Sequence, residues 1–109
     1  MLFLVTGRIE GMVEPTTEFL EASHATLEQL GEMERTGTVK GGGVFIGPLG
    51  VCFVADATSN ESMHLMLTTL PSFRFATWDV VPLIPFHRDI EMSLDAAIES
   101  ARDAEAAGR

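Results

Sequence analysis

Hydrophobic and polar residues follow two different periods along the chain, and these periods predict four strands and two helices. Four segments are rich in β-branched and aromatic residues and end in turn residues, which is typical of strands: residues 2–9, 38–46, 51–55 and 75–81. Two other segments repeat apolar residues at helical spacing behind residues that favour helix caps. They predict one helix from Thr16 or Thr17 to near Gly37, and another that begins at residues 58–60 and ends at Pro71.

The order of these elements, β-α-β-β-α-β, is that of a split βαβ unit, so we expect an α+β, ferredoxin-like subunit. Pro82 and Pro85 are expected to stop the last strand, because proline cannot donate a hydrogen bond in the middle of a sheet. Two helices cover one face of a four-stranded sheet and leave the other face open. A second copy of the chain is the simplest cover for an apolar open face, so the pattern predicts a homodimer.

The last twenty-one residues differ in composition from the rest of the chain. Residues 89–109 hold six acidic residues against two arginines, and their large apolar residues are Ile90, Met92, Leu94 and Ile98. A helix of this kind is marginal on its own. We therefore expect residues 1–88 to form the folded domain, and residues 89–109 to form an acidic C-terminal helix that is ordered by contact with the domain or with a partner subunit.

The charge of the chain limits its partners. Seven basic residues against sixteen acidic ones give a formal net charge of −9. Such a surface repels phosphate backbones and anionic lipids, so we expect neither nucleic acid nor a membrane as a partner.

No apolar run reaches the ~20 residues of a membrane span. The apolar start has no basic leader, so we expect a cytoplasmic protein. Cys52 is the only cysteine and lies in an apolar strand, which indicates a buried structural thiol.

A series of short motifs runs in a fixed order between residues 1 and 86. The motifs are Met1-Leu2-Phe3-x-Val5, Gly37-Thr38, Gly47, Val54-x-Asp56, Ser59 with Glu61, His64, and Leu70-Pro71-x-Phe73. In this order and spacing they resemble the muconolactone delta-isomerases and the small proteins similar to them. The resemblance implies a dimeric α+β barrel, often assembled into larger rings, with a pocket between sheet and helices. It also implies an enzyme that shifts a carbon–carbon double bond in an unsaturated lactone by a proton shuttle and without a cofactor.

The second strand departs from the pattern of those isomerases. Where they carry bulky aromatic and basic side chains, this chain has Gly41, Gly42 and Gly43. We therefore expect a pocket that is roomier and less cationic than theirs.

Two histidines are the candidates for proton transfer. A double-bond shift beside a carbonyl needs one group to remove a proton and another to return it, and imidazole titrates near neutral pH. His64 lies beside the apolar stripe of the second helix, and His24 occupies the same border on the first helix. We expect the two to converge on the groove between the helices as base and acid. A solvated histidine at a helix border is the alternative for each.

Four further residues are candidates for substrate binding. Lys40 and Arg74 could pair with an anionic group of the substrate, Trp78 could form a wall of the pocket, and Met63 could supply an adaptable apolar surface. The alternatives are an edge-protecting charge for Lys40 and core packing for Trp78 and Met63. No two histidines are spaced for one helix face and cysteine occurs once, so we expect no metal site. The resemblance implies that no other cofactor is needed.

These observations leave three functions open. The first is a cofactor-independent isomerase or cyclase that acts on a small, apolar, oxygenated ring such as a lactone or a quinone-like compound. The second is a cofactor-free monooxygenase of the same barrel type. The third is a protein without catalytic activity that binds a small molecule or serves in assembly. The histidines favour the first function, and the missing side chains of the second strand favour the third.

Overall fold

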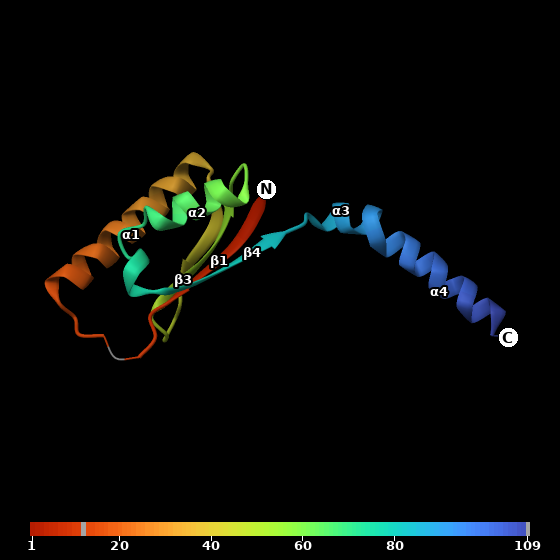
Figure 1. Cartoon of the computed structure of the whole chain (residues 1–109), viewed down its shortest axis with the longest axis horizontal. Coiled ribbons are helices and arrows are strands. Elements are labelled where there is room, and N and C mark those ends of the chain that lie inside the picture. Colours follow the sequence, from red (N-terminus) through yellow and green to blue (C-terminus); the bar gives the residue numbers. More distant parts are fainter. Residues whose placement is uncertain (12, 109) are drawn as a thin grey trace.

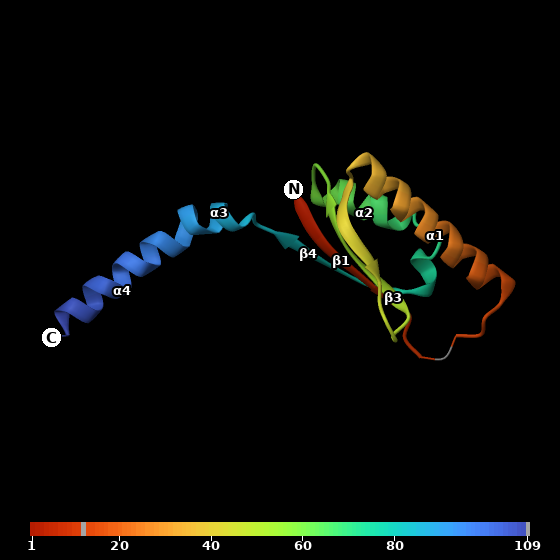
Figure 2. The same ribbon diagram turned by 180° about the vertical axis from the view of Figure 1, so that it is seen from behind.

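The chain folds into one antiparallel four-stranded sheet with two helices on one of its faces (Figures 1 and 2). The structure is a computed structural model that describes residues 1–11 and 13–108. Its strands are β1 (Leu2–Arg8), β2 (Val39–Val44), β3 (Gly50–Asp56) and β4 (Thr77–Leu83), in the sheet order β2-β3-β1-β4. The helices are α1 (Thr17–Thr36) and α2 (Asn60–Thr68). The predicted βαββαβ, ferredoxin-like subunit is thereby confirmed, whereas the predicted homodimer stays a prediction.

The ends of both helices are set by the residues that the sequence indicates. The Thr16 hydroxyl accepts a hydrogen bond from the backbone N–H of Phe19 at 3.2 Å, and Ser59 does the same for Ser62 at 3.1 Å. Helix α1 ends at Gly37, whose φ of 92° lies in the left-handed region that glycine adopts without strain. Local chemistry therefore determines where the two helices begin and where α1 ends.

The core lies between the sheet and the two helices. It consists of strand residues and of the inner face of α2: Phe3, Val5, Val39, Phe53, Ala55, Met63, Leu67 and Leu70. Helix α1 contributes less than its apolar pattern predicts. Its residues Phe19 and Thr26 are buried, whereas Leu20 and Leu27 remain 53% and 45% exposed. The helix is thus rotated so that these two leucines border a groove instead of the core.

Strand β4 begins and ends two residues later than predicted. Phe75, expected to begin the strand, belongs to a short 3₁₀ turn at Phe73–Phe75, and the strand continues through Pro82 to Leu83. The expectation that Pro82 ends the strand is wrong, because β4 is an edge strand. It pairs only with β1, with Pro82 opposite Phe3, so its other side requires no N–H donor.

The sheet face opposite the helices is open and apolar. Strand alternation places on it the residues that lie between the buried ones, among them Leu4, Val54, Val81 and Leu83. Val81 is 50% exposed. Cys52 lies on the same face, half-buried, with its sulfur 3.9 Å from the Thr6 hydroxyl. The thiol that was expected to be buried is therefore partly accessible.

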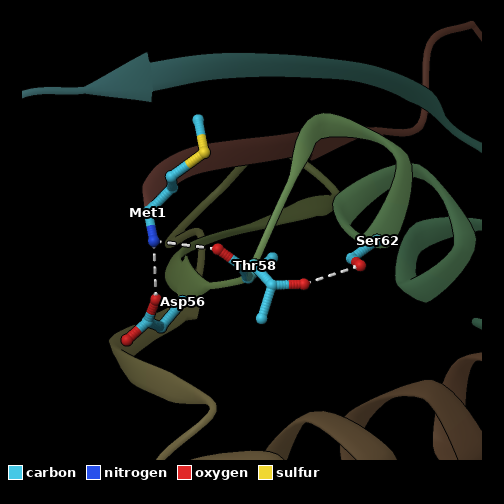
Figure 3. A network of polar contacts seen from close by, with 5 residues as sticks. Met1, Asp56, Thr58 and Ser62 are labelled. Atoms are coloured by element: carbon cyan, nitrogen blue, oxygen red, sulfur yellow. Dashed lines mark hydrogen bonds and ion pairs between the residues drawn. The ribbon is translucent and has the colours of Figure 1, made fainter.

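A small polar network holds the start of β1 against the connection between β3 and α2 (Figure 3). The amino group of Met1 donates to the Asp56 carboxylate at 3.1 Å and to the Ala57 carbonyl at 2.8 Å. The hydroxyls of Thr58 and Ser62 lie 3.0 Å apart in the same region. These contacts fix the N-terminal end of a central strand next to the cap of α2.

After β4 the chain leaves the domain as a helical arm, which we call the C-terminal arm (Phe86–Ala107). It comprises α3 (Phe86–Asp89), a π-helical turn (Ile90–Leu94) and α4 (Asp95–Ala107). The arm projects away from the sheet and helices, and the whole chain measures 69 × 30 × 22 Å (Figure 1). None of the described helices is both long and apolar enough to cross a membrane.

Candidate functional site

A pocket lies between α1 and the sheet, at the end where β1 and β4 meet the turn that follows α2. Its volume is about 240 Å³. An apolar cavity of about 150 Å³ is enough to hold benzene, so this space fits one substituted ring. Its walls are mostly apolar and include Phe19, Leu20, Leu27, Val51 and Trp78.

The floor of the pocket is the indole ring of Trp78, which lies directly on the backbone of Gly7. The two residues are opposite each other in the β1–β4 pairing. A Cβ atom at Gly7 would lie 2.7 Å from Cε3 and 2.8 Å from Cη2 of the ring, so no larger residue fits there without displacing it. The ring is also fixed at its edge, because its Nε1 donates a hydrogen bond to the Phe73 carbonyl at 3.0 Å.

Three hydroxyl groups lie among these apolar walls, on Ser23, Thr26 and Ser72. Thr26 and Ser72 are buried, with 4% and 8% of their surface exposed. Their hydroxyl oxygens are 2.8 Å apart, and the Ser72 backbone N–H donates to the Thr26 hydroxyl at 2.9 Å. Residues 46 positions apart in the sequence therefore join α1 to the turn after α2.

The hydrogen bonds of these hydroxyls leave some bonding capacity free. Ser23 donates its proton to the Phe19 carbonyl at 2.8 Å, so its oxygen can only accept from a ligand. Thr26 has one proton, and both the Ala22 carbonyl and the Ser72 oxygen lie within reach of it. If Thr26 donates to Ala22, Ser72 donates to Thr26 and keeps its lone pairs; if Thr26 donates to Ser72, the Ser72 proton is free. The pocket can thus bind both hydroxyl and carbonyl groups.

Replacing Thr26 with valine, whose side chain has nearly the same shape, is expected to lower the free energy of unfolding. The buried N–H of Ser72 would lose its acceptor, and an unsatisfied buried donor costs about 1–3 kcal/mol. Urea denaturation of the purified variant measures the loss. Thr36→Val on the same helix is the control, since the Thr36 hydroxyl is exposed and bonds only to the Met33 carbonyl. Equal stability of the two variants would show that the Thr26–Ser72 pair contributes nothing.

A second hollow adjoins the pocket along α1. Its volume is about 260 Å³, and it shares Leu27, Val44 and Val51 with the pocket, so the two form one groove beside β2. Among the described residues that line the two hollows, Glu34 carries a titratable side chain; Cys52 also borders the second hollow, but its side chain lies on the opposite face of the sheet. Glu34 was not among the sequence-based candidates, because a glutamate near the exposed end of a helix resembles any solvated charge.

Two cations near the groove, Arg74 and Arg35, are paired with acids of α1. Arg74 forms an ion pair with Glu18 and lies 4.7 Å from the centre of the Phe75 ring. Arg35 hydrogen-bonds to Glu32, and its guanidinium holds the pKa of that carboxyl below its usual range. Both pairs are exposed and lie outside the residues that line the pocket. A pocket without a free cation in its described wall favours a neutral ligand over an anionic one.

The structure corrects the expectation that His64 and His24 converge on the groove. The side chain of His24 is 75% exposed, and its Nδ1 lies 3.2 Å from Glu28 on the outer face of α1. It is roughly 140° around the helix from the buried Phe19. His64 is exposed as well, since α2 buries Met63 and Leu67 and the residue after Met63 points away. Neither imidazole lines the groove formed by the described residues of this chain.

Of the four candidates for substrate binding, one lines the pocket and three do not. Trp78 lines the pocket, as expected. Met63 is 1% exposed and belongs to the core beneath α2, so it does not reach the pocket. Lys40 is exposed at a bulge of β2, and Arg74 is engaged by Glu18. Arg74 belongs to the 3₁₀ turn at Phe73–Phe75, outside the strand that carries Trp78.

The fold and the pocket define a small α+β protein of ferredoxin-like topology with an apolar pocket between its first helix and its sheet. A sequence model of the muconolactone delta-isomerase family matches residues 1–89. The match covers most of the chain, and the chain therefore belongs to this family. A comparison with curated protein sequences gives no match.

Two solved structures share the fold. The chain is similar to a crystal structure of muconolactone isomerase, with a TM-score of 0.68 and 24% identity over 78% of this chain and 90% of that one. It is also similar to 5-chloro-2-hydroxyhydroquinone dehydrochlorinase from Burkholderia phenoliruptrix AC1100, in complex with 2,5-dihydroxybenzoquinone, with a TM-score of 0.59 and 18% identity over 81% of this chain and 98% of that one. At these identities the likeness shows the fold alone.

Proposed function

We propose that this protein is a cofactor-independent isomerase or cyclase that acts on a small, neutral, oxygenated ring. The observation that carries the proposal is the pocket of about 240 Å³, whose apolar walls hold three hydroxyl groups beside Trp78. Family membership supports an enzyme of the isomerase type. A fold relative in complex with 2,5-dihydroxybenzoquinone supports a ring that carries oxygen substituents.

The proposed reaction needs a base, an acid and a group that holds the enolate oxygen. A base removes a proton from the carbon beside the ring carbonyl, the electron pair moves to the carbonyl oxygen, and the proton returns at another carbon as the double bond shifts. The Ser72 hydroxyl is suited to hold that oxygen, because it can donate when Thr26 donates to it. The described residues of the pocket carry no titratable side chain, so the proposal assigns the proton transfer to the Glu34 carboxylate of the adjoining hollow, which requires the ring to lie where the two hollows meet.

Binding can be measured with the protein's own fluorescence. Trp78 is the only tryptophan and the chain contains no tyrosine, so the emission reports the pocket alone. We expect saturable changes on titration with 2,5-dihydroxybenzoquinone or an unsaturated five-membered lactone, and calorimetry provides a check that is free of optical absorption. A linear, unsaturable response to both compounds would contradict the proposed ligand class.

Proton transfer is tested by exchange in deuterated water, which detects removal of a proton even without net isomerisation. We expect the protein to accelerate deuterium uptake beside the lactone carbonyl, and Glu34→Gln to reduce the acceleration by about 10²–10⁴. His64→Ala is measured in parallel. If that variant loses exchange while Glu34→Gln keeps it, the base is His64, contributed across a subunit interface.

The second candidate function is binding without catalysis. It is favoured by one observation, that the described residues of the pocket itself include hydroxyls but no titratable side chain. Saturable binding of the ring compounds together with no exchange above the solvent rate would select this function.

A further inference from the structure

The second hollow is bordered by two glycines, one on each of its walls. Gly31 lies on α1 and Gly42 on β2, and both line the hollow of about 260 Å³. A Cβ atom at Gly31 would meet nothing within 4 Å, so no described neighbour requires a glycine there. Glycine in the interior of a helix is destabilising relative to alanine. The glycine of α1 therefore weakens the helix and leaves the hollow open.

The strand wall of the hollow is bare for a different reason. Gly42 has a φ of 155°, in the region that favours glycine, and its Cβ atom would lie 2.6 Å from Cβ of Phe53. Strand β2 as folded cannot carry a side chain at this position. Both walls thus leave space where most helices and strands would place a side chain.

One stripe of α1 lines both hollows. Its residues are spaced by three and four positions and are, in order, Ser23, Thr26, Leu27, Leu30, Gly31 and Glu34. Hydroxyl groups lie at one end of the stripe, a carboxylate lies at the other, and apolar residues lie between them. Thr26 and Glu34 are separated by roughly 12 Å along the helix axis, at 1.5 Å per residue. A ligand that contacts both ends must therefore be elongated.

The size and continuity of the two hollows agree with such a ligand. Each hollow is larger than the cavity of about 150 Å³ that holds benzene, so each can hold one ring. They share Leu27, Val44 and Val51, so one rigid molecule can occupy both. Leu27 lies between them with 45% of its surface exposed. A molecule that fills both hollows would cover this leucine.

We infer that the second hollow is a subsite for an apolar second ring, so that the ligand of this protein is an oxygenated ring fused to another ring. The inference rests on the proposed function, because it extends the same ligand. The oxygenated ring contacts the hydroxyls beside Trp78, and the second ring lies against Leu30, Val39 and Phe53. A fused pair of rings spans the junction of the two hollows and brings the ligand from the hydroxyls to Glu34.

A matched pair of neutral lactones separates the two hollows. The lactone 2-pyranone is a single unsaturated ring, and coumarin is the same ring fused to an apolar second ring. We expect the unchanged protein to bind coumarin at least about tenfold more tightly in calorimetry, because its second ring leaves water for the second hollow. In full-length Gly31→Leu the added side chain extends into that hollow. The advantage of coumarin should then fall below about twofold, with the affinity for 2-pyranone unchanged.

Two further variants control for the added side chain. Leucine favours helix, so Gly31→Leu is expected to remain folded, which circular dichroism verifies. Glu21→Leu places the same side chain on α1 at an exposed position outside both hollows, and it should keep the full advantage of coumarin. Gly31→Ala adds a single methyl group and should reduce the advantage only in part.

The outcomes separate this inference from the proposed function. Equal affinities of the unchanged protein for the two lactones would overturn the subsite and leave the proposed function standing, and an equal loss of both lactones in Gly31→Leu would do the same. If the unchanged protein binds neither lactone, the proposed ligand class fails and the subsite fails with it. A changed sedimentation of Gly31→Leu with the advantage of coumarin intact would show that another chain enters the hollow, which also overturns the inference.

Discussion

Replacing Val81 with aspartate is expected to break the predicted homodimer into monomers. Val81 lies on the open face of the sheet and is 50% exposed in the single chain, so a charged side chain there is solvated in the monomer. In a dimer built on this face, the aspartate would lose its water and find no partner among Leu4, Val54 and Leu83. Burial of an uncompensated charge costs several kcal/mol, which corresponds to a dissociation constant raised more than about 100-fold.

The measurement is sedimentation velocity over a range of concentrations, with circular dichroism to verify that the variant is folded. Leu65→Asp is the matched control, because Leu65 is 64% exposed on α2, on the helix side of the sheet. It should associate like the unchanged protein. If the unchanged protein already sediments as a folded monomer at micromolar concentration, the predicted homodimer does not exist, and the open face has another role.

Replacing Gly7 with alanine is expected to abolish ligand binding. The added methyl group would lie within 2.8 Å of the Trp78 ring atoms Cε3 and Cη2 and force the indole upward into the pocket. Since the pocket measures only about 240 Å³, a displaced indole leaves too little space for a ring. Overpacking of this kind also destabilises a fold by about 1–3 kcal/mol, so the variant should remain folded for the assay.

Binding is followed by calorimetry, because the fluorescence of Trp78 itself will change in this variant. Gly41→Ala is the control on β2, where a Cβ meets nothing within 4 Å and the residue lines neither hollow. Alanine within a strand is favoured over glycine, so the control should be as stable as the unchanged protein or more stable, by about 0.5–1 kcal/mol, and should bind the ring compounds normally. Unchanged affinity in Gly7→Ala would show that the ligand binds elsewhere, whatever its chemistry.

Much of the fold is predictable from local patterns in the sequence. Cap chemistry at Thr16, Ser59 and Gly37 depends on neighbouring residues only, and the structure confirms each position. The periods of apolar residues give the order of strands and helices. The ends of β4 were missed, because the tolerance of a strand for Pro82 depends on whether the strand lies at the sheet edge, and that is a property of the whole sheet.

The site was less predictable because it depends on contacts between distant residues. The apolar spacing of α1 identifies a helix but does not give its rotation to within one residue, and that rotation directs Thr26 inward and His24 to the surface. The pairing of β1 with β4 places Trp78 over Gly7, and the turn after α2 brings Ser72 to Thr26. The sequence by itself determined the elements, the family and the acidic arm, because these follow from local spacing and composition. Only the tertiary structure decided which side chains meet in the pocket, because packing selects one rotation of each helix and one register of each strand.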